Sequence, residues 1–231
     1  MGAGRPGGYI YFSLPFVAVF GPTVWGERAL SVISGLGIII LMYFLGRKLF
    51  NEKVGIIASL LMAISPWDIY LSRGGFEAHF ALFLAVFGLT MFYYKRYVWW
   101  AIAWGLTFFT YPTFKLTIPL MFLLVVFIQG FAGLVKEKKF IAGTIVIFLF
   151  GIAAASQTFI AGSENRFLSE NIFSDKMLRR DIITVLNQER STSTLPDFLK
   201  PLVINKPIAY GRIFIDNYVA NISPDFLILR G

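Results

Sequence analysis

Long apolar runs separated by short charged segments are the feature that most constrains this sequence. A helix needs about 20 apolar residues, within a range of roughly 17–25, to cross the hydrocarbon core of a bilayer. Six runs reach or approach this length: Ala29–Leu45, Val54–Trp67, Phe80–Tyr94, Tyr97–Tyr111, Leu116–Val135 and Phe140–Ala161. We therefore predict an all-α polytopic membrane protein with about six transmembrane helices, the shorter of which extend into their flanks or face a wet cavity.

The composition excludes the other common classes of chain. Hydrophobic residues make up 57% of the 231 positions and charged residues only 15%, whereas a soluble domain carries about 25% charged residues. Disordered and collagen-like chains are excluded by the same numbers. The absence of Cys and the presence of a single His exclude disulfide scaffolds, thiolate nucleophiles, Cys-based zinc sites and multi-His metal sites. We expect no cofactor and find no cluster of metal ligands in the sequence, which leaves metal dependence open.

The apolar pattern divides the first part of the chain into two regions. Residues 1–27 are expected to be an extracytoplasmic segment. Within it, Tyr9–Phe20 is only 12 residues long and contains Pro15, which indicates an interfacial helix and not a spanning one. Residues 28–161 then hold the six-helix transmembrane domain.

The last region, residues 162–231, has a different composition. It contains no spanning run and carries nine basic and eight acidic residues. We expect a small, mostly helical extracytoplasmic segment. Its helices are predicted near Phe173–Gln188, with Ser174 or Asp175 as N-cap, and near Pro207–Ala220.

The net charge of +8 is a topology signal, because cytoplasmic loops are enriched in Lys and Arg. Three alternate loops hold eight basic residues against two acidic ones: Arg47, Lys48, Lys53, Lys95, Arg96, Lys136, Lys138 and Lys139. We place these loops in the cytoplasm, and the N-terminus and C-terminal segment outside, in a multi-pass protein of the cell membrane. Dispersed charge predicts no nucleic-acid partner. Trp99, Trp100 and Trp104 are expected to form an aromatic belt at the cytoplasmic interface.

Two charged residues stand at the outer end of a predicted membrane helix, on either side of Gly74-Gly75. Arg73 precedes the glycine pair and Glu77 follows it closely. Charged side chains at membrane depth usually mark a functional site or pair with one another. Both alternatives stay open for Arg73 and Glu77 at the level of sequence.

Three more ionisable residues lie on the same predicted side of the membrane. Asp68 is either a catalytic carboxylate or a helix-end residue. His79 is either a general base, since imidazole titrates near neutrality, or a histidine hydrogen-bonded to a neighbour. Lys115 either binds a phosphate or extends its ammonium group to the interface.

Several stretches, in order along nearly the whole chain, resemble the membrane-embedded C-type (GT-C) glycosyltransferases. The likeness is to the family 39 branch, which contains protein O-mannosyltransferases and aminoarabinose transferases. The stretches that carry it are Tyr9–Phe16 with Phe20, Gly21, Pro22, Trp25 and Arg28, then Tyr43–Phe50, Ile64–Trp67, Ser72–Ala78, and in the tail Asn217, Tyr218, Ser223–Leu227 and Arg230-Gly231.

The resemblance implies transfer of a sugar from a polyprenyl-phosphate donor to a hydroxyl of a protein, lipid or glycan acceptor. Transfer takes place at the outer face and inverts the anomeric centre. Arg73 matches a family arginine linked to donor binding, and Arg5 and Lys115 are further candidates for the donor phosphate. The candidates for general base are Glu77, Asp68 and His79.

The main catalytic carboxylate of the family precedes the segments matched here. We therefore expect the general base upstream of residue 1, and the chain to be an internal fragment that is inactive alone. A polytopic transporter or flippase and a non-catalytic membrane subunit are the alternatives. Ionisable residues cluster at the outer interface and no inverted repeat is visible, which favours interfacial chemistry over transport.

Overall fold

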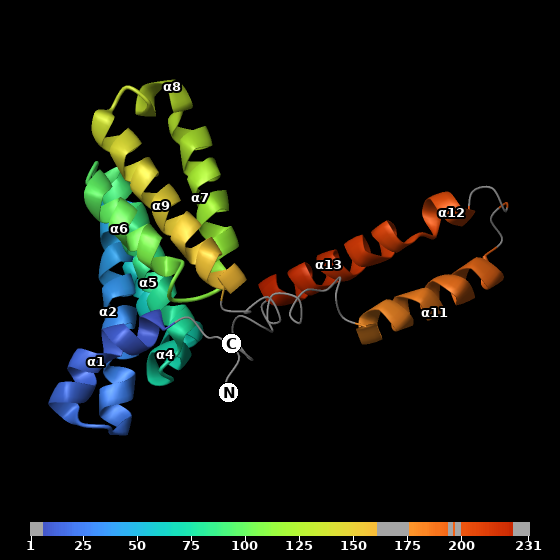
Figure 1. The fold of residues 1–231 in the computed structure, drawn as a ribbon, viewed down its shortest axis with the longest axis horizontal. Helices are drawn as coiled ribbons and strands as arrows, with labels where there is room; N and C mark the ends of the chain where they lie inside the picture. The colour runs from blue at the N-terminus through green and yellow to red at the C-terminus, as the bar shows by residue number, and fades with distance from the viewer. Residues whose placement is uncertain (1–6, 161–175, 194–195, 197–199, 224–231) are drawn as a thin grey trace. The chain divides into compact units, whose positions relative to one another are not determined.

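The computed structural model describes residues 7–160, 176–193, 196 and 200–223 (Figure 1). It divides into two compact units, Met1–Ala161 and Gly162–Gly231. Every regular element in the described residues is a helix. The prediction of an all-α membrane protein is therefore confirmed, while the boundaries at 27/28 and 161/162 stay predictions. Helix α2 begins at Val24, inside the segment that the sequence assigns to the N-terminal region.

The first unit is a helical bundle in which the long helix α2 lies at one side and α7 and α9 lie at the other (Figure 1). Helices α1, α3, α4 and α5 pack against α2, and α6 packs between α5 and α9. The bounds of the helices are α1 Gly8–Phe20, α2 Val24–Leu49, α3 Glu52–Ala63, α4 Pro66–Arg73, α5 Glu77–Tyr93, α6 Tyr97–Thr107, α7 Phe114–Gln129, α8 Phe131–Leu134 and α9 Lys138–Ile160.

Local sequence signals explain where several of these helices begin and end. The Thr23 and Asn51 side chains accept hydrogen bonds from the first turns of α2 and α3, which satisfies backbone donors that have no partner within the helix. Pro66 begins α4 and disfavours helical backbone at the residue before it, so α3 and α4 meet at a 54° bend. Gly130, with φ of +80°, ends α7 because glycine adopts that conformation without steric cost.

The number of helices long enough to cross a membrane is lower than the six that the apolar runs predict. Within the described residues, α2 and α9 are long and apolar enough, and the bent pair α3–α4 adds a third if it counts as one span. Helices α1, α5 and α7 are apolar but shorter. Two of the runs continue through helix breaks, at Pro66 and at Gly130, so the helices within them are shorter than the runs.

The core of the first unit is aromatic and surrounds two tryptophans. Trp100 and Trp104 have no exposed surface, and Trp100 stacks on Phe140 with ring centroids 5.5 Å apart. The Trp104 indole donates a 3.0 Å hydrogen bond to the Ala85 carbonyl. The expected aromatic belt is therefore wrong for these two residues, whereas Trp99 is 57% exposed.

The basic loops gather at one end of this bundle. Lys95 and Glu137, from two different loops, form a 2.8 Å ion pair, and the Lys48 ammonium lies 5.4 Å from the centre of the Tyr94 ring. The hydrogen bond from Lys95, followed by one from Tyr97, holds the pKa of the Glu137 carboxyl below its usual value. These contacts join the ends of α2, α5 and α8, as expected if the helices alternate in direction.

The second unit contains α11 Lys176–Thr192, α12 Lys200–Val203 and α13 Lys206–Ile222. Ile182, Leu186 and Ile204 form its small core. The Arg190 guanidinium donates two hydrogen bonds, of 2.9 and 2.6 Å, to the Ile204 carbonyl. Helix α13 contains the helix predicted at Pro207–Ala220. Ser174 and Asp175, the expected N-caps of the other predicted helix, lie outside the described residues.

The buried tryptophans generate a stability prediction. We expect Trp104→Phe to lower the free energy of unfolding in detergent micelles by about 1–3 kcal/mol, because it leaves a void and removes a buried hydrogen bond. Trp99→Phe is the matched control and should change little, since that side chain is exposed. Equal effects of the two changes on denaturant unfolding would show that Trp104 is not in the core.

Candidate functional site

The end of the bundle opposite the basic loops is closed by polar contacts between α1, α2 and the α6–α7 connection. The Tyr9 hydroxyl donates a 2.9 Å hydrogen bond to the Glu27 carbonyl and lies 3.1 Å from the Ser31 hydroxyl. The Gly8 amide donates a 3.0 Å hydrogen bond to the Phe109 carbonyl. These contacts fix the short helix α1 across the start of α2.

A groove of about 1020 Å³ opens beside this closed end. Two cations line it, Arg28 near the start of α2 and Arg73 at the last residue of α4. The rest of the lining is almost entirely apolar: Phe16, Phe20, Thr23, Val24, Trp25, Ala29, Val32 and Ile33. The groove therefore combines a long apolar wall with two guanidinium groups.

No carboxylate neutralises these two arginines in the part of the chain that the structure describes. Arg28 and Arg73 form no ion pair there, and in particular Arg73 does not pair with Glu77. Both side chains are exposed, and an anion lying between two like charges would be attracted to both. Guanidinium groups bind phosphate and carboxylate oxygens through paired, charge-assisted hydrogen bonds. The groove thus fits an amphipathic ligand with an anionic head.

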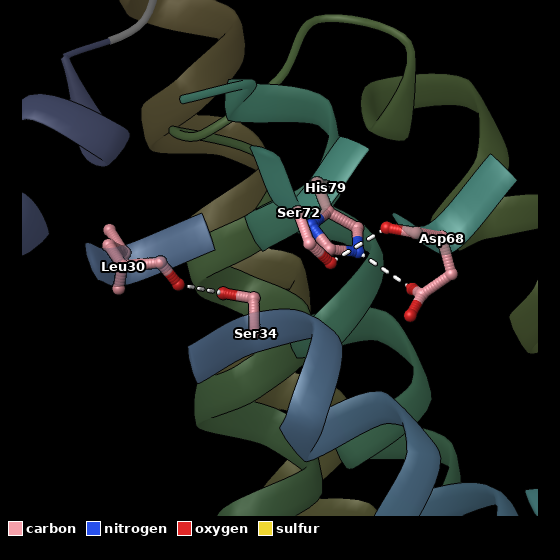
Figure 2. A network of polar contacts seen from close by, with 5 residues as sticks. All are labelled: Leu30, Ser34, Asp68, Ser72 and His79. Atoms are coloured by element: carbon pink, nitrogen blue, oxygen red, sulfur yellow. Dashed lines mark hydrogen bonds and ion pairs between the residues drawn. The ribbon is translucent and has the colours of Figure 1, made fainter. Parts of the chain in front are cut away.

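A buried polar pair lies between α4 and α5 (Figure 2). The His79 Nε2 atom is 2.9 Å from the Asp68 Oδ1 atom, and the two residues are 0% and 3% exposed. The second ring nitrogen, Nδ1, is buried without a hydrogen-bond partner among the described residues. A protonated Nδ1 would be an unsatisfied donor, so we place the proton on Nε2, which donates to Asp68.

Helix α2 approaches this pair closely at Gly35. A Cβ atom at that position would meet the Ser72 hydroxyl and would lie 3.1 Å from His79 Cε1 and 3.4 Å from Asp68 Oδ2. The Ser72 hydroxyl itself donates to the Asp68 carbonyl at 2.7 Å (Figure 2). Gly35 is therefore the contact that lets α4 lie against α2.

The sequence candidates separate into different places in the fold. Arg73 shares the groove with Arg28, and Asp68 pairs with His79 in the interior. Glu77 is half-buried in the first turn of α5 and is not among the residues that line the groove.

The two remaining candidates for binding phosphate are not placed beside Arg73. Lys115 lines another apolar groove, of about 420 Å³, between α7 and α9, where its ammonium group lies 3.4 Å from the Ala154 carbonyl. Arg5 lies outside the described residues. In the ranges that the structure describes, no three His, Asp or Glu side chains gather as metal ligands would.

Arg28 and the Asp68–His79 pair are what sequence reasoning missed. Arg28 counts in the sequence only as a loop charge and as part of a family likeness. Arg28 lies three residues after Trp25 and four before Val32, so all three share one helix face. This spacing could have identified Arg28 as part of an apolar helix face. No sequence spacing pairs Asp68 with His79, because a helix end and a glycine turn separate them.

The helices and their apolar runs define an all-α membrane protein, one groove of which is lined by two arginines. The family model described as dolichyl-phosphate-mannose-protein mannosyltransferase matches residues 5–155. The chain belongs to that family and is a membrane glycosyltransferase of the mannosyltransferase-like type. No curated protein and no solved structure matches the chain significantly.

The close approach at Gly35 generates a second prediction. Gly35→Ala should destabilise the protein by about 1–3 kcal/mol, because its new methyl group overlaps the Ser72 hydroxyl. Removing that hydroxyl in Gly35→Ala/Ser72→Ala should restore part of the loss. Gly151→Ala is the control, since a Cβ there meets only Phe108 at an ordinary 3.8 Å. Thermal unfolding in detergent measures all three, and a silent Gly35→Ala would contradict the packing described here.

Proposed function

We propose that the chain binds a polyprenyl-phosphate sugar in the groove of Arg28 and Arg73, and that the sugar is transferred from there to an acceptor hydroxyl. The carrying observation is the pair of guanidinium groups on an otherwise apolar wall. The apolar wall accommodates part of the polyprenyl chain, and the arginines bind the phosphate. Membrane lipid borders the remaining apolar surface of the bundle.

The proposed chemistry explains why cations are needed at this position. The oxygen of an acceptor hydroxyl attacks the anomeric carbon as the bond from that carbon to the phosphate oxygen breaks. The hydroxyl proton passes to a general base, and the electron pair of the broken bond stays on the phosphate. Attack opposite the leaving group inverts the anomeric centre. Negative charge grows on the departing phosphate, and guanidinium groups placed beside it stabilise the transition state more than the ground state.

We assign no general base among the described residues. Asp68 and His79 hydrogen-bond each other in the interior, and Glu77 does not line the groove.

The groove generates a functional prediction. Arg28→Gln and Arg73→Gln should each weaken binding of polyprenyl-phosphate mannose by about tenfold or more, because each removes charge-assisted hydrogen bonds to phosphate. Arg47→Gln is the matched control at the opposite end of α2 and should bind normally. Equilibrium binding of radiolabelled donor to the purified chain measures this effect. Transfer by native membranes that carry the protein measures the consequence for catalysis.

Two results would contradict this proposal. One is unchanged donor binding in both groove variants. The other is a loss of binding in Arg47→Gln that equals the loss in Arg73→Gln, since this would indicate a nonspecific charge effect.

We further propose that the groove faces the outside of the cell membrane and the basic loops face the cytoplasm. The chain has no Cys, so single cysteines report orientation cleanly. A membrane-impermeant maleimide added to intact cells should label Tyr70→Cys, which is exposed at the groove end, and not Phe50→Cys at the basic end. Labelling of Phe50→Cys alone would reverse the orientation.

A further inference from the structure

We propose that Asp68 and His79 are positioning residues: their buried hydrogen bond fixes α4 so that Arg73 shares the groove with Arg28. This inference rests on the proposed function of the groove. It gives the interior pair a role in donor recognition without contact to the donor.

Helix α4 depends on contacts with the rest of the bundle for its position. It has only eight residues, and isolated helices shorter than about 12–15 residues are marginal in water. Trp67, Ile69 and Tyr70 are 36%, 43% and 57% exposed, and of the three only the Tyr70 ring makes a ring contact among the described residues, with Phe76 at 5.7 Å. Of the eight residues of α4, Asp68 alone is buried.

The bond between Asp68 and His79 joins α4 to α5 across the turn at Gly74-Gly75. His79 lies in the first turn of α5, which packs on both α2 and α6 and is a firm part of the bundle. Arg73 follows Asp68 by five residues on the same helix, or about 7.5 Å along its axis. A tilt of α4 at Asp68 therefore displaces Arg73 directly.

The other arginine of the groove has an anchor of its own. Arg28 follows Glu27, whose carbonyl accepts the Tyr9 hydroxyl bond, and Ser31 lies one turn further along α2. The Gly75 backbone lies beside this hydrogen bond, because a Cβ atom at Gly75 would be 3.5 Å from both the Glu27 carbonyl oxygen and the Tyr9 hydroxyl. Each cation is thus held close to a buried or half-buried polar contact, as expected where the spacing of two guanidinium groups matters.

The chemistry of the pair suggests variants that keep or remove the bond. Asp68→Asn keeps an acceptor oxygen of the same shape, and Asp68→Ala removes it. His79→Gln places an amide nitrogen near the position of Nε2, whereas the shorter His79→Asn does not reach. Asp68→Asn is therefore the matched control for Asp68→Ala, and His79→Gln is the matched control for His79→Asn.

The experiment compares farnesyl phosphate with farnesol as probes for the whole chain in detergent micelles. The ratio of their dissociation constants isolates recognition of the phosphate. We expect the unsubstituted protein to prefer the phosphate by about tenfold or more. Asp68→Ala and His79→Asn should lose most of this preference while their affinity for farnesol stays unchanged. Asp68→Asn and His79→Gln should retain it.

The possible outcomes separate the two proposals. Full phosphate preference in Asp68→Ala and His79→Asn, even with a lower melting temperature, would overturn the positioning role, since it would show that the pair only stabilises the fold. No phosphate preference in the unsubstituted protein, or full preference in Arg73→Gln, would instead overturn the proposed function of the groove. If Asp68→Ala does not fold, the comparison of His79→Gln with His79→Asn decides.

Discussion

The cost of placing a charged side chain in hydrocarbon is the constraint on which this structure depends. A charge at the centre of a membrane helix costs about 3 kcal/mol or more, so charged residues collect at helix ends. Helix α2 shows this arrangement most directly, with Arg28 near its start, Arg47 near its end and an apolar stretch between them. The other helices of the first unit pack around α2 or its neighbours, so their charges also gather at two opposite ends.

The charged residues at the two ends of the bundle differ in whether they have partners of opposite charge. At one end Lys95 pairs with Glu137, Lys48 lies beside the Tyr94 ring, and the other basic residues are exposed. At the other end the bend between α3 and α4 carries Arg73 to the groove that Arg28 lines, where neither has a carboxylate partner among the described residues. An ion pair at the first end stabilises loops, whereas unneutralised cations at the second end favour an anionic ligand.

The fold could be predicted from the sequence to the extent that hydropathy determines it. The apolar runs located the helices, and Pro66 and Gly130 mark breaks that the runs ignore. The fate of the tryptophans could not be predicted, because an indole suits an interface and a core equally well. Trp100 and Trp104 are buried because α5 and α9 offer partners such as Phe140, which only the packing reveals.

The candidate site was predicted in part. Charge at membrane depth identified Arg73, and a family likeness gave the same residue a role. Arg28, from a different helix, joins it only in three dimensions. Asp68 and His79 were each found as single polar residues, but their pairing depends on the turn between α4 and α5, whose geometry no spacing rule supplies.

A structure of the protein with a bound polyprenyl phosphate would test the central claim most directly. The measured quantity is the set of distances from the phosphate oxygens to nearby nitrogen atoms. We predict guanidinium nitrogens of both Arg28 and Arg73 at about 2.7–2.9 Å, the usual length of a charge-assisted hydrogen bond. A phosphate bound beside Lys115 in the groove between α7 and α9, with Arg28 and Arg73 unoccupied, would contradict it.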